Sequence, residues 1–161
     1  MATLYTKKGD DGFTETLGNE RIPKCDNLIC LIGTLDEFSA VLGVCRAHAK
    51  DGDLKKDIES LQEKLIGIMG ELSGGRVCAD ENAVQIIEEL IDKYSGEFSG
   101  CSIPGKNMLS AYLNLARCVV RRAERIAAEC MGENKIRKNA YCCLNRLSDL
   151  MYAMSRYAEQ I

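Results

Sequence analysis

The stretch that decides the fold reads LARCVVRRAER at residues 115–125. It lies within a run free of glycine and proline, which predicts one long helix from about Lys106 to Met131. Arg117, Arg121 and Arg125 are spaced i, i+4 and i+8, so they form one row along that helix. The apolar positions predict a buried stripe on another face, made of Met108, Tyr112, Leu115, Val119, Ala123, Ile126 and Cys130.

The arginine row carries more positive charge than a helix that faces only solvent needs. Like charges at this spacing destabilise a helix by roughly 0.3 kcal/mol per pair, and Glu124 offers a single carboxylate within reach of Arg121. Guanidinium groups match phosphate oxygens with two parallel hydrogen bonds, which a lysine cannot do. The row therefore indicates a bound anion or carboxylates from elsewhere, with a basic solvent-facing surface as the alternative.

Length and composition favour one helical domain over residues 1–161. Of the 161 residues, 46% are hydrophobic and 28% charged, and only two are prolines, which interrupt helices. The net charge of −3 gives no attraction to nucleic acid or to an anionic membrane. No apolar run approaches the ~20 residues of a membrane span, and the N-terminus lacks the apolar core of a signal peptide. We therefore expect a cytoplasmic protein with neither nucleic acid nor membrane as a partner.

The nine cysteines do not form a metal-binding pattern. Their number is odd, no Cys-x-x-Cys pair occurs, and His48 is the single histidine. A di-iron bundle would need two Glu-x-x-His units, so no metal site in the protein itself is expected. Most cysteines occupy apolar helical positions and are interpreted as small buried thiols in a reducing compartment. His48 is expected at the surface, at a helix end.

Four further helices follow from apolar residues that recur every three or four positions. They span about 26–49, 53–72, 81–94 and 134–160, with Asp53 and Asn134 as expected N-caps. Their predicted buried stripes are Leu31, Leu35, Phe38, Leu42 and Cys45; Leu54, Ile58, Leu61, Leu65, Ile68 and Leu72; Ile87, Leu90, Ile91 and Tyr94; and Leu144, Leu147, Met151, Met154, Ala158 and Ile161. Five helices with short links predict an all-α antiparallel bundle over residues 27–161, with little or no sheet.

Residues 1–26 form a glycine-rich N-terminal arm without helical periodicity. The arm contains three glycines at positions 9, 12 and 18, together with the basic residues Lys7, Lys8, Arg21 and Lys24. Glycines let backbone N–H groups close around an anion, and the basic side chains add charge. The arm lacks the Gly-x4-Gly-Lys-Ser/Thr spacing of a P-loop. A mobile arm without a ligand is the alternative that the residues leave open.

Four segments together resemble one known family. They are YTKKGDDGFT at residues 5–14 with RIPK at 21–24, GTLDE at 33–37, ARCVVRRAER at 116–125, and LNRLSDL at 144–150. The family is the PduO-type ATP:cob(I)alamin adenosyltransferases, which have a Thr-Arg/Lys-x-Gly-Asp-x-Gly arm and an Arg-x3-Arg-Arg-Ala-Glu-Arg helix. The match runs nearly end to end in the same order, so it is far more specific than any single motif.

The resemblance implies a five-helix bundle that assembles as a homotrimer, with ATP and a corrinoid bound between subunits. Its members transfer the 5′-deoxyadenosyl group of ATP to the cobalt of cob(I)alamin, with Mg2+ assisting, and release adenosylcobalamin and triphosphate. A corrinoid reductase and an adenosylcobalamin-dependent enzyme would be partners. A slow or non-catalytic relative that carries or senses ATP or adenosylcobalamin is the first alternative, and a purely structural helical module is the second.

The resemblance also implies roles for matching residues. The ATP-binding set would be Thr6, Lys7, Lys8, Gly9, Thr14, Glu15 and Lys24 in the arm, with Arg121, Arg122, Glu124, Arg125 and Asn145 in the bundle. Arg117 would pair with Asp36 across a subunit interface, and both would support catalysis with Arg121. The family has a phenylalanine under the corrin where this chain has Cys101, and Phe98 is the other candidate to face the corrinoid. Glu15 stands where the family has a small polar or basic residue.

Overall fold

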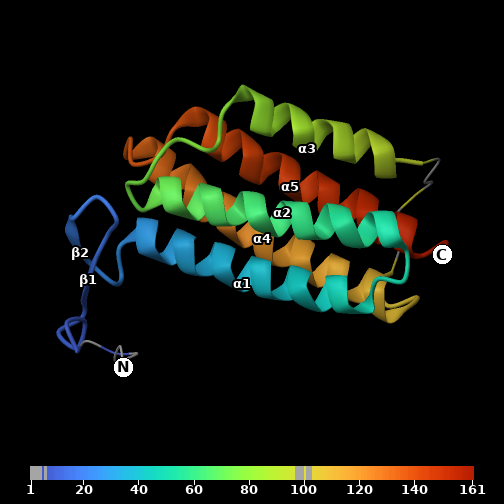
Figure 1. Ribbon diagram of the computed structural model, residues 1–161, viewed down its shortest axis with the longest axis horizontal. Coiled ribbons are helices and arrows are strands. Elements are labelled where there is room, and N and C mark those ends of the chain that lie inside the picture. Colours follow the sequence, from blue (N-terminus) through green and yellow to red (C-terminus); the bar gives the residue numbers. More distant parts are fainter. Residues whose placement is uncertain (1–4, 6, 97–99, 101–102) are drawn as a thin grey trace.

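The computed structural model describes residue 5, residues 7–96, residue 100 and residues 103–161, and it contains an all-α bundle of five helices (Figure 1). The helices are α1 Asn27–His48, α2 Gly52–Leu72, α3 Glu81–Tyr94, α4 Met108–Gly132 and α5 Lys138–Ala158. α4 packs along both α1 and α5, while α2 lies against α1 and α3 against α5. The predicted five-helix architecture is confirmed.

The ends of the helices explain two errors of the sequence analysis. Asp51, not Asp53, caps α2, because its carboxylate accepts hydrogen bonds from the backbone N–H groups of Asp53 and Leu54. Asn134 does not cap α5 either. It sits in the left-handed region with φ 56° just beyond α4, and Arg137 precedes α5 without a side-chain cap.

The core confirms the predicted stripes of α1 and α2 and corrects that of α4. On α4, Met108 and Leu115 are 57% and 49% exposed, whereas Leu113, Ala116 and Val120 are fully buried. The prediction was wrong because it followed the larger apolar side chains, whereas the buried face of α4 runs through the small residues Ala116, Ala123 and Ala127, on which α1 and α5 pack. The other buried residues of α4 are Leu109, Ser110, Asn114, Val119, Ala123, Ala127 and Cys130. Ile161, expected in the core, lies beyond α5 and is exposed.

The N-terminal arm contains a short hairpin that the sequence analysis did not predict. Strand β1 (Phe13–Glu15) pairs antiparallel with strand β2 (Arg21–Pro23), and Thr14 lies opposite Ile22. Ile22 is buried, so the hairpin contributes one apolar side chain to the packing. The hairpin projects from the end of the bundle where α1 begins and α4 ends (Figure 1).

The turn of the hairpin docks on the C-terminal end of α2. The backbone N–H of Leu17 donates to Ser73 Oγ, and that of Gly18 donates to the Ser73 carbonyl, both at 3.0 Å. Gly74 has φ +91°, and a Cβ at this position would lie 2.9 Å from the Gly18 N and Cα atoms. Only glycine combines this conformation with so close an approach of two backbones.

Two ion pairs fasten neighbouring segments at the same end of the bundle. Lys135 donates to Asp26, the N-cap of α1, and this hydrogen bond lowers the pKa of the Asp26 carboxyl. Burial raises the pKa of Glu71, but hydrogen bonds from Arg137 and from the backbone of residues 78 and 79 outweigh it, so the net pKa lies below the usual range. These two ion pairs therefore tie the link between α4 and α5 to the start of α1 and to the end of α2.

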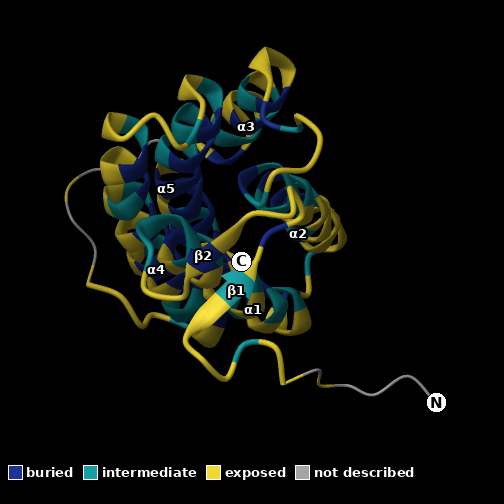
Figure 2. Ribbon diagram, turned by 90° about the vertical axis from the view of Figure 1, so that its left-hand side faces the viewer, coloured by how far each residue is buried: buried dark blue, intermediate teal, exposed yellow. Residues whose placement is uncertain are grey.

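Helix α1 is apolar on more than one face. It is long and apolar enough to cross a membrane by length and composition, with a mean hydropathy of 1.8, so the expectation of no such segment is wrong. Its stripe from Leu31 to Cys45 is buried in the bundle, which accounts for one face (Figure 2). Small and apolar residues also lie on the exposed face, at Cys30, Gly33, Ala40 and Val44. A helix that is apolar all round needs cover on both sides.

Candidate functional site

The arginine row of α4 faces outward, as predicted. Arg121 and Arg125 are exposed, and neither makes a hydrogen bond or ion pair with another residue that the structure describes. Two guanidinium groups one helical turn apart repel each other, and nothing in the described part of the chain compensates them. The row thus leaves two exposed guanidinium groups available to an anion from outside this chain.

Glu124 and Asn145 join the row to α5. The Asn145 amide donates to Glu124 Oε1 at 2.8 Å, and its carbonyl oxygen accepts from Arg146 at 2.7 Å. Arg146 in turn pairs with Glu88 of α3 at 2.9 Å. Glu124 therefore bonds to the neighbouring helix, not to Arg121 as its sequence position allowed, and the network holds Asn145 in place beside the row.

Arg122 lies on the side of α4 that faces α1. Its guanidinium forms an ion pair with Glu37, so it points away from the line of Arg121 and Arg125. This pair is formed by two half-exposed side chains and is an ordinary surface salt bridge in the single chain. The contact of Arg122 with a nucleotide stays a prediction.

Arg117 differs from Arg121 and Arg125 because part of its guanidinium group is buried. Its Nε atom is buried and has no hydrogen-bond partner, which is costly for a charged group. Asp36 is exposed on α1. The antiparallel pairing of Glu37 with Arg122 places Asp36 and Arg117 of one chain about 9 Å apart along the helix axes, at 1.5 Å per residue. Within one chain the two residues therefore do not meet.

The arm forms a cationic cavity of about 640 Å3. Its walls are Lys8, Gly9, Phe13, Thr14, Glu15 and Arg21. Lys24 holds the loop of residues 9–12 closed. Its ammonium donates to the Gly9 carbonyl at 2.7 Å, and its backbone N–H donates to the Gly12 carbonyl at 2.8 Å. A Cβ on Gly9 would lie 2.9 Å from the Lys24 Nζ, so a larger residue here would shift the Lys24 side chain that closes the loop. The structure thus brings four predicted arm residues, Lys8, Gly9, Thr14 and Glu15, to one cavity, with Lys24 beside it.

Arg21 is a cavity residue that the predicted binding set omits. Its guanidinium pairs with Asp11 and lies 4.6 Å from the centre of the Phe13 ring. The sequence signal was the basic cluster of the arm, but nothing in it distinguished Arg21 from a surface charge before the hairpin register was known. Lys7 lies in the left-handed region with φ 61° and is exposed, with its ammonium near the Tyr5 ring. Thr6, Phe98 and Cys101 lie outside the described residues.

The donor groups for a metal ion are not clustered. Among the residues that the structure describes, no group of three or more His, Cys, Asp or Glu side chains could hold a metal. His48 is exposed at the end of α1 and stacks on Tyr112 at 5.6 Å. The fold and the site together define a helical-bundle protein that presents guanidinium groups and a cationic hairpin to a polyanion.

Comparisons with known proteins identify the family. The family described as "Cobalamin adenosyltransferase" matches residues 4–158. The corrinoid adenosyltransferase of Citrobacter freundii is 35% identical, over 99% of this chain and 96% of its own length. The corrinoid adenosyltransferase PduO of Salmonella typhimurium is 30% identical over 95% of this chain, which spans about half (48%) of that longer protein.

A solved structure agrees with this assignment. A single-residue variant of a PduO-type ATP:corrinoid adenosyltransferase from Lactobacillus reuteri, complexed with cobalamin and ATP, superimposes with a TM-score of 0.88. It is 28% identical, and the match covers 98% of this chain and 94% of that one. The chain belongs to the cobalamin adenosyltransferase family.

Proposed function

We propose that this protein is an ATP:corrinoid adenosyltransferase that moves the 5′-deoxyadenosyl group of ATP onto the cobalt of cob(I)alamin. The observation that carries the proposal is the exposed pair of Arg121 and Arg125, which bond to no other described side chain, on a chain of this family. We do not favour a carrier or sensor, because the proteins that this chain resembles are named as adenosyltransferases.

The chemistry needs no nucleophile from the protein. Cob(I)alamin attacks C5′ of ATP with the electron pair of its cobalt, the C5′–O bond breaks, and inorganic triphosphate leaves with the bonding electrons. Negative charge accumulates on the departing oxygen, so fixed positive groups at that place stabilise the transition state. The protein contributes position and electrostatics, and the cobalt contributes reactivity.

We assign the ATP contacts to two basic surfaces, the arm cavity and the arginine row of α4. The arm cavity takes the triphosphate through Lys8, Gly9 and Thr14, with Thr6, Lys7 and Lys24 completing the loop. Arg121 and Arg125 hold phosphates and adenosine from α4, with Arg122, Glu124 and Asn145 beside them. Mg2+ keeps several waters and binds phosphates with one or two carboxylates. Glu15, which lines the arm cavity, would be the carboxylate available to that ion.

A homotrimer completes the site. The exposed apolar face of α1 and the exposed Asp36 support the proposal that a second copy of the chain covers this surface. In the proposed assembly Asp36 of one subunit pairs with Arg117 of the next, and ATP and corrinoid bind at that boundary. A cytoplasmic location, a corrinoid reductase and an adenosylcobalamin-dependent enzyme as partners belong to the same proposal.

Charge reversal tests the contact between subunits. Arg117→Asp alone should lower turnover and weaken the trimer, since it places like charges at one boundary. Combining it with Asp36→Arg should restore both, because the pair is rebuilt with its signs exchanged. Anaerobic turnover and sedimentation velocity on the two single variants and the double variant measure this. A double variant as impaired as the singles would argue against the pairing.

Position 101 tests the corrinoid contact. Cys101→Phe should raise the rate with cob(I)alamin severalfold, because an aromatic side chain fills the space under the corrin and displaces the lower ligand better than a thiol. Stopped-flow absorbance after reduction of cobalamin in the presence of ATP measures the rate. An unchanged rate would assign the lower face to another residue, with Phe98→Ala as the next variant. Wild-type protein that binds ATP but forms no adenosylcobalamin after hours would instead support a carrier or sensor.

A further inference from the structure

A second cavity lies at the opposite end of the bundle from the hairpin, where α1 and α5 end and α4 begins. It has a volume of about 410 Å3, which falls within the usual range for small-ligand sites of about 300–1,000 Å3. Its lining is mostly apolar, and none of the predicted ATP residues that the structure describes is part of it. The lining residues are His48, Lys50, Asp51, Asn107, Met108, Leu109, Ala158 and Ile161.

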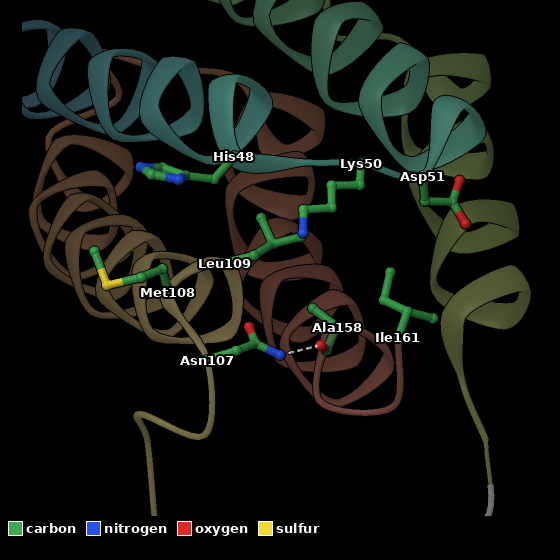
Figure 3. A pocket seen from close by; sticks show the side chains of 8 residues that line it. All are labelled: His48, Lys50, Asp51, Asn107, Met108, Leu109, Ala158 and Ile161. Carbon is green, nitrogen blue, oxygen red and sulfur yellow. Dashed lines mark hydrogen bonds between the residues drawn. The ribbon is translucent and has the colours of Figure 1, made fainter.

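Two polar side chains of this cavity are already hydrogen-bonded within the protein, and a third is available to bind a ligand. Asp51 is committed, because its carboxylate accepts from the Tyr157 hydroxyl at 2.8 Å and from the backbone of α2. Asn107 is committed as the cap of α4, and its amide donates to the Ala158 carbonyl at 2.6 Å. The Lys50 ammonium makes no ion pair with any described residue and reaches down between the ends of α4 and α5 (Figure 3). Lys50 is therefore the charged side chain of the cavity that remains available to a ligand, and its charge is positive.

The His48 ring adds an aromatic edge to the same site. It stacks on Tyr112 with 17° between the ring planes. Figure 3 shows His48 beside Met108 at one side of the cavity and Ile161 at the other. A flat apolar group can contact Met108, Leu109 and Ile161, while an attached anion meets Lys50. The matching ligand carries an aromatic base and a phosphate.

The corrinoid substrate has such a part. In a complete cobalamin the lower base hangs from the ring on a linker that contains a phosphodiester, and reduction to Co(I) releases the base from cobalt. Arg121 and Asn145, assigned to ATP, are each 13 positions along their helices from Met108 and Ala158, about 20 Å at 1.5 Å per residue. A corrin ring bound with its cobalt at the ribose would span part of that distance and leave its linker within reach of the cavity.

We propose that this cavity receives the released nucleotide loop of the corrinoid, with the phosphate at Lys50 and the base on Met108, Leu109 and Ile161. The inference rests on the proposed function and identifies which part of the substrate this end of the bundle recognises. It makes the cavity a specificity site for corrinoids that carry a lower nucleotide. Corrinoids without one should bind through the ring alone.

The test compares cob(I)alamin with cob(I)inamide, which has no nucleotide loop. Lys50→Ala should raise the KM for cob(I)alamin about tenfold, the loss of one charge-assisted contact, and leave the KM values for cob(I)inamide and ATP unchanged. Lys56→Ala, an exposed lysine at the same end of α2, is the matched control and should change none of them. Met108→Trp, which fills the cavity from an exposed position, should reproduce the effect of Lys50→Ala.

Each outcome separates this inference from the proposed function. Equal rises in KM for both corrinoids, or no rise for cob(I)alamin in either variant, would overturn the nucleotide-loop site while the adenosyltransferase assignment stands. Wild-type protein that adenosylates neither corrinoid would overturn the proposed function itself. A selective effect confined to cob(I)alamin supports both.

Discussion

Replacing Arg121 by alanine should lower kcat/KM for ATP by about 100- to 1,000-fold while the helical content stays unchanged. Removing one preorganised charge at the place where charge develops typically has an effect of this size. Arg121 is exposed and bonds to no other described residue, so its loss creates no cavity and breaks no contact in the fold. Anaerobic formation of adenosylcobalamin measures the change in kcat/KM, and circular dichroism measures the helical content.

The matched control for this variant is Arg46→Ala. Arg46 is an arginine of α1 whose guanidinium pairs with Glu59 of α2 at 2.8 Å. A surface pair of this kind contributes about 0–1 kcal/mol, so the control should keep full activity and almost full stability. Wild-type turnover in Arg121→Ala would contradict the assignment of the arginine row to ATP. Arg121→Lys should recover only part of the rate, because an ammonium lacks the two-pronged geometry.

Replacing Gly74 by alanine should raise the KM for ATP about tenfold and leave kcat for bound ATP nearly unchanged. The new methyl group would lie 2.9 Å from the Gly18 backbone at a residue with φ +91°, so the hairpin turn must move off the end of α2. The hairpin carries Thr14 and positions Gly9 and Lys24, and the triphosphate cavity moves with it. A shift of this kind costs binding energy of about 1.4 kcal/mol for each tenfold in affinity.

Gly70→Ala provides the control four residues earlier on α2. A Cβ at Gly70 meets no atom within 4 Å, and glycine inside a helix is destabilising by roughly 0.5–1 kcal/mol relative to alanine. This variant should therefore be as active as the wild type and slightly more resistant to denaturant. If Gly74→Ala left the KM for ATP unchanged, the hairpin would not depend on its contact with α2. A fall in kcat with no change in KM would also contradict a positioning role.

Periodicity alone was enough to predict most of the core. The α1 stripe from Leu31 to Cys45 and the α2 stripe from Leu54 to Leu72 are buried as expected, because each of these helices turns one continuous stripe into the bundle. The same method failed on α4, where Met108 and Leu115 face out. The buried face of α4 contains alanines, which are less apolar than the exposed Met108 and Leu115, so its orientation is set by contacts with α1 and α5 that are distant in sequence.

The candidate site was also predictable from the sequence only in part. Spacing along one helix fixed the row of Arg117, Arg121 and Arg125, since residues i and i+4 must lie on one face whatever surrounds them. The hairpin was not predictable, because its strands are three residues long and the pairing of Thr14 with Ile22 gains stability only once Ile22 is buried. The cavity role of Arg21 follows from that register alone.

The sequence by itself determined the helical class, the line of guanidinium groups and the family pattern, because each is a local property of consecutive or regularly spaced residues. The tertiary structure decided which partners these groups have. Contacts between segments far apart in sequence pair Arg122 with Glu37, leave the Arg117 Nε without a partner, seat Gly18 on Gly74 and place Lys50 over a cavity at the far end of the bundle. Such contacts depend on how whole helices pack, and no spacing within one segment encodes them.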